Sequence, residues 1–392
     1  MSANRARYDH LISFIRKRYG EGFIPLHRPV FAGNEKTYLV ETIDSNFVSS
    51  VGQRVSNFET MIAAFTGARH AIATVNGTAA LHTSLVLAEV KAGDEVISQA
   101  LTFVATCNAI CYVGAKPVFV DVDRDTLGLS PSALRHWLMA NAEMRDCRSF
   151  NRKTGAHIAA CVPMHTFGLP LRIAEVANVC REWGIPLVED SAESLGSYTG
   201  AAHTGNDGLM AALSFNGNKV ITTGGGGMIL TGDEAIAKRA KHLTTTAKVP
   251  HPYEFVHDEV GFNYRLPNLN AALGCAQMET LPSMLAIKRE IAEGYRNYCG
   301  DNGWTFIDQP AGTSANFWLN AILLNDRTER DTFLEHMNAR GIMVRPIWRL
   351  MSSLEMFRNC QTDGLENSQW LEDRVVNLPS GVPDQDIGRV HV

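Results

Sequence analysis

Lys219 is the residue whose surroundings point most directly to chemistry. It lies in the segment SFNGNKVITTGGGGM (214–228), among small, polar and glycine residues rather than on a charged helical face. Most lysines are solvated surface residues, and Lys219 is open to that interpretation as well. A lysine amine can also condense with an aldehyde cofactor and then move protons. This second interpretation requires partner groups elsewhere in the chain.

Candidate partners follow two predicted strands. Asp190 ends the strand IPLVED (185–190), where its carboxylate either holds a pyridine nitrogen protonated or caps the turn that follows. Asn76, Gly77 and Thr78 lie between a predicted strand and a predicted helix, and backbone amides at a helix N-terminus bind phosphate. Asn-Gly is also a common turn dipeptide, so this signal is weak by itself.

Three further side chains complete the set. Ser214 and Asn216 precede Lys219 and offer polar groups to the same phosphate. Phe103 offers a ring face, although a single phenylalanine more often belongs to the core. A phosphate cradle, an aromatic ring, a carboxylate and a lysine thus occur in order along one predicted sheet. That order suits pyridoxal phosphate, which needs a phosphate grip, a ring face, an acid at its nitrogen and an amine for its aldehyde.

The elements that must position these residues alternate between short apolar strands and helices from about residue 60 to 232. This pattern predicts a parallel sheet covered on both faces, with ligands beyond the carboxyl ends of its strands. Predicted strands cover 70–75, 94–99, 116–123, 157–164 and 185–190, and predicted helices cover 58–66, 76–90, 102–114, 130–140 and 171–184. Pro250 and Pro252 interrupt the alternation, and a further helix is predicted from about Leu269. We expect a large domain over 1–250, including the N-terminal segment, and a smaller domain over 251–392.

The composition limits the classes of protein to which the chain can belong. Of its 392 residues, 45% are hydrophobic and 20% are charged, as in globular proteins with a sizeable core. Its 36 basic and 41 acidic residues give a net charge of -5, which argues against nucleic acid or an anionic membrane as the main partner. No apolar run approaches the roughly 20 residues that span a bilayer, and the charged N-terminus lacks a signal-peptide core. We therefore expect a cytoplasmic protein.

The eight cysteines indicate neither a metal site nor a disulfide framework. None forms a C-x-x-C pair, and Cys107 and Cys111 have no neighbouring histidine or third cysteine to complete a zinc site. We expect small buried thiols and no metal. No G-x-G-x-x-G lies between a predicted strand and helix, which disfavours a dinucleotide-binding protein.

Several motifs in a consistent order resemble the DegT/StrS family of pyridoxal phosphate-dependent nucleotide-sugar aminotransferases. They are NGTAALH, TFVATCNAI, PMHTFG, VEDSAESLGS, SFNGNK, TTGGGGM and GFNYRLPNLNAALG. The resemblance implies the aspartate aminotransferase (type I) fold, an α/β large domain with a mostly parallel sheet and a smaller C-terminal α+β domain. The segments IDSNFVSSVG, VNGTAALH and SFNGNKVITTGGGGM are most similar to the subgroup acting on UDP-linked 4-keto-6-deoxy-N-acetylhexosamines, which serves bacillosamine and legionaminic acid pathways.

When the roles known in the family are carried over to the matching positions of this sequence, the resemblance implies two catalytic residues. Lys219 would bond covalently to the aldehyde carbon of the cofactor and act as general acid and base, and Asp190 would pair with the pyridinium nitrogen. Phe103 would stack on the ring. Gly77 and Thr78 would offer backbone amides to the phosphate.

The same resemblance assigns further contacts to the cofactor. Ser214 would supply a hydroxyl to the phosphate and Asn216 a further contact, and Asn263 would reach the phosphate from the second subunit of a homodimer with shared active sites. Glu193 falls where many relatives carry a glutamine that contacts the cofactor's phenolic oxygen. A carboxylate there would repel that oxygen unless it is protonated or paired.

Three residues are candidates for substrate contact. His165, in PMHTFG, would lie near the sugar, and a histidine held by backbone partners is the alternative. His27 and Arg28 would touch the nucleotide diphosphate, and an exposed surface loop is the alternative.

The implied reaction moves the amino group of L-glutamate to the C4 keto group of a nucleotide-linked 4-keto-6-deoxy sugar. The subgroup resemblance favours UDP-2-acetamido-2,6-dideoxy-4-hexulose and a role in bacterial lipopolysaccharide or capsule biosynthesis. A sugar dehydratase using the same cofactor is the alternative within the family, but such enzymes typically carry histidine in place of Lys219. A non-catalytic regulatory protein on the same fold is the alternative from another class.

Overall fold

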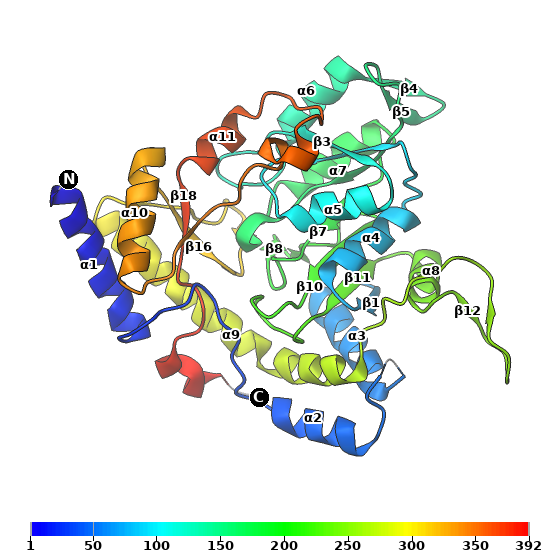
Figure 1. The fold of residues 1–392 in the computed structure, drawn as a ribbon, viewed down its shortest axis with the longest axis horizontal. Coiled ribbons are helices and arrows are strands. Elements are labelled where there is room, and N and C mark those ends of the chain that lie inside the picture. Colours follow the sequence, from blue (N-terminus) through cyan, green and yellow to red (C-terminus); the bar gives the residue numbers. More distant parts are fainter. Residues whose placement is uncertain (1, 50, 391–392) are drawn as a thin grey trace.

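A mixed β-sheet lies at the centre of the computed structural model, which describes residues 2–49 and 51–390 (Figure 1). Its strands, in spatial order, are β1 (His70–Thr74), β11 (Gly227–Thr231), β10 (Met210–Ser214), β7 (Val188–Asp190), β6 (Ile158–Val162), β2 (Glu95–Gln99) and β3 (Lys116–Val120). Parallel bridges from Cys161 to Leu187 and from Met164 to Asp190 join β6 to β7.

All of these strands run parallel except β11, which is antiparallel to both β1 and β10. The expectation of an α/β protein with a mostly parallel sheet is therefore confirmed. The predicted strands do not include β10 and β11. The segment MAALS of β10 contains no β-branched residue, and GMILT of β11 begins with the last residue of a glycine run, so the strand signal of each is weak.

Helices cover both faces of the sheet because successive side chains of a strand point to opposite sides. On β11, Ile229 packs in one apolar cluster, whereas Met228 and Leu230 pack in another. One face is covered by α4 (Gly77–Leu87), α5 (Val104–Tyr112) and α8 (Glu234–Thr244), and the other by α3 (Gln53–Thr66), α6 (Pro131–Asn141), α7 (Ile173–Glu182) and α9 (Asn268–Asp301).

Two helix starts follow from capping side chains. Asn76 caps α4 by accepting a hydrogen bond from the backbone N–H of Ala79 at 2.7 Å. Ser130 caps α6 in the same way through Ala133 at 3.3 Å, with Pro131 at the first helical position as predicted. The first of these caps also orients the free amides of the candidate phosphate site.

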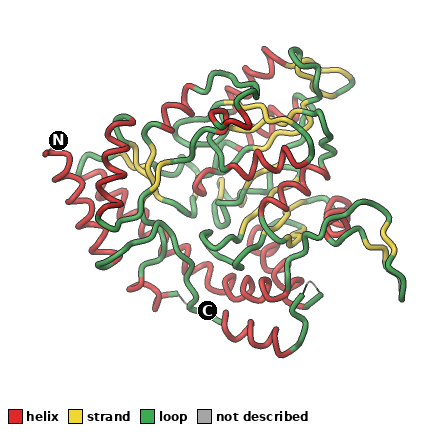
Figure 2. Tube along the Cα trace, viewed as in Figure 1, coloured by secondary structure: helices red, strands yellow, loops and turns green. Residues whose placement is uncertain are grey.

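The C-terminal part of the chain forms a separate antiparallel sheet, visible as a second group of strands in Figure 2. Its order is β14 (Thr305–Phe306), β16 (Asn320–Leu323), β18 (Val375–Leu378) and β17 (Arg345–Pro346), and α10 (Arg327–Ala339) and α11 (Glu366–Glu372) belong to the same part. The N-terminal helix α1 (Ser2–Tyr19) packs beside α10, where the ring of Tyr8 lies 5.2 Å from that of Phe333 (Figure 1). This contact joins the predicted N-terminal segment to elements of the predicted C-terminal domain.

One further α-helix and several short strands lie outside these two sheets. They are α2 (Glu35–Asp44), β4 (Ala142–Arg145), β5 (Arg148–Asn151), β8 (Tyr198–Thr199), β9 (Ala202–His203), β15 (Thr313–Ser314), β12 (Lys248–Val249) and β13 (Val256–His257). The hairpin of β12 and β13, which we call the arm (Lys248–His257), extends away from the body of the molecule (Figure 1). At its tip, Tyr253 and Phe255 are each 82% exposed.

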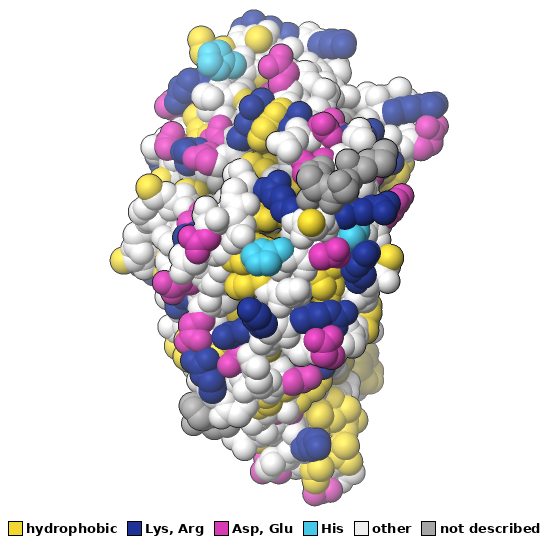
Figure 3. Space-filling view, turned by 90° about the vertical axis from the view of Figure 1, so that its left-hand side faces the viewer, with side chains coloured by type: hydrophobic (Ala, Val, Ile, Leu, Met, Phe, Trp, Pro, Cys, Tyr) yellow, Lys and Arg dark blue, Asp and Glu magenta, His cyan; other side chains and the backbone are white. Residues whose placement is uncertain are grey.

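One face of the molecule carries side chains of both charges. On the face that carries α1, basic and acidic side chains are interspersed (Figure 3). Exposed ion pairs of the chain include Arg16–Glu21 and Arg389–Glu290. Within the described ranges, no helix has both the length and the apolar character needed to cross a membrane.

Candidate functional site

A cavity of about 250 Å³ lies at the carboxyl ends of the parallel strands. Eight of the residues predicted from the sequence line it: Gly77, Thr78, Phe103, Asp190, Glu193, Ser214, Asn216 and Lys219. These residues come from four separate segments, so their convergence is a property of the fold. The topology of β1, β2, β7 and β10 brings their strand ends to one edge.

The N-terminus of α4 forms an anion cradle at one end of this cavity. The backbone amides of Gly77 and Thr78 find no acceptor among the described residues, as the first turn of a helix requires. Ser214 ends β10 beside them, and a Cβ atom built on Gly77 would lie 2.9 Å from the Cβ of Ser214. The cradle therefore offers unpaired N–H groups and a hydroxyl at a helix N-terminus, which fits a phosphate.

The glycine run that follows Lys219 also supports this cradle. A Cβ atom on Gly227 would lie 2.4 Å from the carbonyl of Asn76 and 2.7 Å from the nitrogen of Gly77. Real Cβ contacts of that length do not occur against backbone, so β11 can approach the cradle only through glycine. Position 227 in the glycine run therefore requires glycine for a steric reason.

Asp190 lies at the end of β7 and is buried, with 2% of its surface exposed. Its Oδ2 accepts a hydrogen bond from Oγ1 of Thr106 at 2.6 Å, and its Oδ1 accepts one from the N–H of Ala192 at 3.1 Å. Burial raises the pKa of Asp190, while these hydrogen bonds lower it. A cation placed against this carboxylate, such as a protonated pyridine nitrogen, would compensate for its burial.

Lys219 and Glu193 form an ion pair inside the cavity. The Nζ of Lys219 donates to Oε1 of Glu193 at 3.1 Å and lies 4.0 Å from the centre of the Trp318 ring. Burial raises the pKa of Glu193 to about 7, although the charge of Lys219 lowers it. A lysine in contact with an acid, a ring face and a free volume is placed to react with a carbonyl carbon.

Two tryptophans from the C-terminal part of the chain close the cavity, and the sequence analysis did not identify them. Trp318 and Trp348 both line it, and Nε1 of Trp318 donates to the carbonyl of Asn218 at 2.6 Å. Trp348 lies 6.1 Å from Phe103, which is itself 47% exposed at the start of α5. No local motif marks either tryptophan, because each reaches the cavity through the docking of distant segments.

His165 is predicted near the sugar but does not line the cavity. It is fully buried, and its Nε2 lies 3.0 Å from Oε2 of Glu189. Its Nδ1 accepts a hydrogen bond of 3.3 Å from the N–H of Leu171. Both ring nitrogens therefore have protein partners. One partner is a backbone group, as in the alternative of a histidine held by backbone partners, and the other is a side-chain carboxylate.

The other predicted substrate and partner-subunit residues also lie outside the cavity lining. Arg28 is exposed and forms an ion pair with Asp384. Burial and the charges of Lys288 and Lys219 hold the pKa of His27 well below its usual range. Asn263 is exposed on a segment that pairs with Thr245. This exposure leaves the Asn263 side chain accessible to a second molecule.

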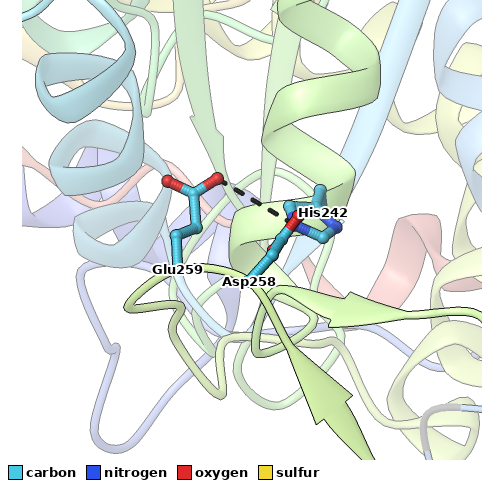
Figure 4. A group of neighbouring side chains, drawn as sticks. All are labelled: His242, Asp258 and Glu259. Atoms are coloured by element: carbon cyan, nitrogen blue, oxygen red, sulfur yellow. Dashed lines mark hydrogen bonds and ion pairs between the residues drawn. The ribbon is translucent and has the colours of Figure 1, made fainter.

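A cluster of His242, Asp258 and Glu259 lies outside the cavity at the base of the arm (Figure 4). Nε2 of His242, in the last turn of α8, lies 2.6 Å from Oδ1 of Asp258 and 3.9 Å from Glu259, whose other oxygen lies 3.0 Å from Arg239. The hydrogen bond from His242 lowers the pKa of Asp258. These contacts fasten the segment directly after the arm to α8.

The cavity therefore combines an amine, a buried acid, an anion cradle and aromatic walls. This set fits pyridoxal phosphate: the cradle matches the phosphate, Asp190 matches the ring nitrogen and Lys219 matches the aldehyde. The free amides of Gly77 and Thr78 are the structural observation behind this fit, since they are polar groups that still require an acceptor.

Comparison with known proteins gives one consistent result. The model of the DegT/DnrJ/EryC1/StrS aminotransferase family matches residues 30–390. EpsN of Bacillus subtilis (strain 168), provisionally described as a pyridoxal phosphate-dependent aminotransferase, is 34% identical over 374 residues, which cover 94% of each chain. GDP-perosamine synthase of Vibrio cholerae is 33% identical over 372 residues, which cover 94% of this chain and 97% of that protein. The solved structure of DesI with its TDP-sugar product has a TM-score of 0.81 at 26% identity and covers 96% of this chain and 94% of DesI.

Proposed function

Because the chain belongs to the DegT/DnrJ/EryC1/StrS aminotransferase family and is a pyridoxal phosphate-dependent transaminase, we propose that it moves an amino group from L-glutamate to the C4 keto group of a nucleotide-linked 4-keto-6-deoxy sugar. The observation that carries this proposal is the convergence of Lys219, Asp190 and the α4 cradle on one cavity. The type I fold of this family accounts for the division into a large and a small domain, which we place at about residue 250.

The residues of the cavity divide the work of such a reaction. When bound, pyridoxal phosphate supplies an aldehyde that takes up the amino group and a ring that withdraws electrons from the carbon losing its proton. Lys219 Nζ would accept the α-proton of glutamate in the first half and deliver a proton to C4 of the sugar in the second. Asp190 would keep the ring nitrogen protonated, and the amides of Gly77 and Thr78 would hold the phosphate.

The remaining contacts are part of the same proposal. Phe103 would stack on the ring, and Ser214 and Asn216 would add side-chain contacts to the phosphate. All three line the cavity, which supports these roles. His27 and Arg28 would contact the nucleotide diphosphate of the substrate.

We assign the sugar to the UDP-2-acetamido-2,6-dideoxy-4-hexulose class and the pathway to bacterial surface glycans. The support is the similarity of VNGTAALH and SFNGNKVITTGGGGM to that subgroup. The similar GDP-perosamine synthase and DesI are named for a GDP-sugar and a TDP-sugar, so the nucleotide must be tested directly. Nucleotide-linked sugars are formed from cytoplasmic nucleotides, and we place the enzyme in the cytoplasm for that reason.

A homodimer with shared active sites is the assembly that we propose. The arm carries Tyr253 and Phe255, and α2 carries Val40 and Ile43, which are 56% and 57% exposed. Apolar side chains gathered on a surface mark an interaction site. In Figure 3 hydrophobic side chains gather at the end of the molecule where α2 lies. Asn263 would reach the phosphate of the partner subunit's cavity.

The rival reaction within the family is sugar dehydration. Dehydratases of this kind typically carry histidine at the lysine position, whereas this chain has Lys219 facing the cavity. A non-catalytic protein of the same fold would not need the ion pair between Lys219 and Glu193. The presence of both features favours transamination.

Absorption spectroscopy tests the proposal directly. Purified protein with pyridoxal phosphate should be yellow, and L-glutamate should replace the yellow band by that of the aminated cofactor. Adding UDP-, GDP- and dTDP-linked 4-keto sugars one at a time should restore the yellow band for the true acceptor. A yellow protein that ignores glutamate would contradict the donor assignment, and a colourless protein would contradict the whole proposal.

A further inference from the structure

Glu193 depends on Lys219 for the compensation of its charge. Its side chain is 1% exposed, so water does not solvate the carboxylate. Oε1 accepts a hydrogen bond from Nζ of Lys219 at 3.1 Å, and Oε2 accepts one from the backbone N–H of Phe167 at 2.9 Å. A buried carboxylate is stable as an anion only while such partners remain.

The backbone around Glu193 fixes the position of this carboxylate. Phe167 has a φ of 57°, in the left-handed region that non-glycine residues rarely adopt. Asn316 donates through Nδ2 to the carbonyl of Glu193 at 2.8 Å and to that of Leu195 at 2.9 Å. These contacts hold the backbone that carries the Glu193 carboxylate and the N–H of its partner Phe167.

Loading of the cofactor would change those charges. Condensation of the Lys219 amine with an aldehyde forms an N–C bond and releases the carbonyl oxygen as water. It leaves at most one N–H on a nitrogen that carried three as an ammonium. The phosphate also brings negative charge into the cavity. Asp190, the acid whose charge acts on Glu193 from β7, adds repulsion.

We propose that Glu193 takes up a proton when pyridoxal phosphate binds and then acts as a neutral hydrogen-bond donor that positions the bound cofactor. This inference rests on the proposed function and deepens it. Asp190 would stay ionised because it faces the cation of the ring nitrogen, whereas Glu193 loses donors from Lys219. The two buried carboxyl groups of one cavity thus reach opposite protonation states through their surroundings.

The raised pKa of Glu193, about 7 with Lys219 as an ammonium, supports this proposal. The Glu193 carboxylate is mostly ionised at pH 7.5 before pyridoxal phosphate binds, so it can take up a proton on binding. Any weakening of the contact with Lys219 moves the equilibrium further toward the neutral acid.

Isothermal titration calorimetry of the cofactor-free protein with pyridoxal phosphate measures this proton. The titration is run at pH 7.5 in PIPES, HEPES and triethanolamine, which are tertiary amines and do not condense with the aldehyde. The slope of the binding enthalpy against the ionisation enthalpy of the buffer gives the net proton uptake. Wild type should take up about 0.5 to 0.8 proton more than E193Q, since the cofactor and Asp190 titrate alike in both.

A control variant and an independent infrared measurement make the comparison specific. E355Q makes the same chemical change on an exposed glutamate whose side chain is 78% accessible, and it should keep the wild-type slope. Infrared difference spectra of wild type should show a protonated carboxyl band on loading that E193Q lacks. The infrared measurement on wild type remains decisive even where E193Q does not fold.

The outcomes separate the inference from the proposed function. Equal slopes for wild type and E193Q, or loading of wild type without a new carboxyl band, would overturn the protonation of Glu193 while leaving the transaminase assignment intact. A protein that binds no pyridoxal phosphate would overturn both. Saturable binding with the larger uptake in wild type supports both.

Discussion

The hydroxyl of Thr106 donates a hydrogen bond of 2.6 Å to Oδ2 of Asp190 and so joins the first turn of α5 to the end of β7. This bond lowers the pKa of an acid that burial raises. Thr106 therefore helps to keep Asp190 ionised without touching the reacting atoms. It is a positioning residue for the proposed reaction.

T106V should test this relationship, since valine keeps the shape of threonine but cannot donate. Loss of one hydrogen bond to a charged group should lower kcat/KM about tenfold. The acidic limb of the pH–rate profile should move to higher pH, because the pKa of Asp190 rises further. T60V, which removes an exposed hydroxyl bonded within α3, serves as control. An unshifted profile in T106V would exclude the positioning role.

K219A should abolish transamination and also change stability in a pH-dependent way. Without the ammonium, the pKa of Glu193 rises above its value of about 7. A folded-state pKa above the unfolded value means that stability is greatest at low pH and is lost as pH rises through the folded pKa. K219A should therefore lose roughly 3 kcal/mol against wild type at pH 8 and less at pH 5. Denaturant unfolding of K219A and K219A/E193Q checks this, and the double variant should recover stability at pH 8.

G227A should disrupt the anion cradle. The added methyl group would lie 2.4 Å from the carbonyl of Asn76, so either β11 or the start of α4 must move. We expect the affinity for pyridoxal phosphate to fall by about tenfold or more and the unfolding free energy to fall by about 1–3 kcal/mol. G225A is the matched control, because its nearest neighbour, the carbonyl of Val75, would lie 3.9 Å away. Equal affinity in the two variants would contradict the steric role of Gly227.

His203 should make the fold sensitive to mild acid. Its Nε2 accepts from the N–H of Gly196 at 2.8 Å and its Nδ1 faces the carbonyl of Thr204 at 2.5 Å, so the neutral ring is required. Burial lowers the pKa of His203 from 6.5 to about 4. The unfolded chain therefore binds more protons between these values, and stability is lost as pH falls from 6.5 toward 4.

The expected loss from His203 is roughly 3 kcal/mol over that window. Denaturant unfolding at pH 7 and pH 4.5 measures it for wild type and H203Q. Glutamine can still accept from Gly196 but does not titrate, so the difference between the two pH values should be smaller in H203Q. The same difference in both proteins would place the acid sensitivity elsewhere.

Mixing inactive variants should reveal whether the cavity is shared. If Asn263 serves the partner's cavity, a mixed dimer of N263A and K219A holds one cavity with both residues intact. With random assortment, co-expressed chains should recover about one quarter of wild-type activity. K219A mixed with itself should recover none. If N263A alone is impaired and the mixture is as inactive as the two single variants, Asn263 serves the cavity of its own chain.

The residues at strand ends were the predictable part of this site. Asp190 ends one predicted strand and Asn76 follows another, and the carboxyl ends of parallel strands meet at one edge. Alternating strands and helices were enough to predict that edge. The antiparallel strand β11 was not predicted, because its pairing with β1 depends on contacts far apart in the chain.

The walls of the cavity could not be predicted in the same way. Trp318 and Trp348 reach it from the C-terminal part, and a tryptophan carries no local signal that distinguishes a cavity wall from a core. His165 shows the converse case. Its motif suggested the substrate, but its two ring nitrogens meet Glu189 and Leu171 in the interior.

The position of β11 between β1 and β10 also bears on how the chain folds during synthesis. β1 pairs with β11, which leaves the ribosome about 150 residues later. The Asn76–Gly77 turn therefore has no β11 to pack against for roughly 8 to 30 s at usual translation rates. During that interval β1 is an unpaired edge strand, which is prone to associate with other chains. Chaperone binding to nascent chains should therefore be strongest before residue 231 emerges.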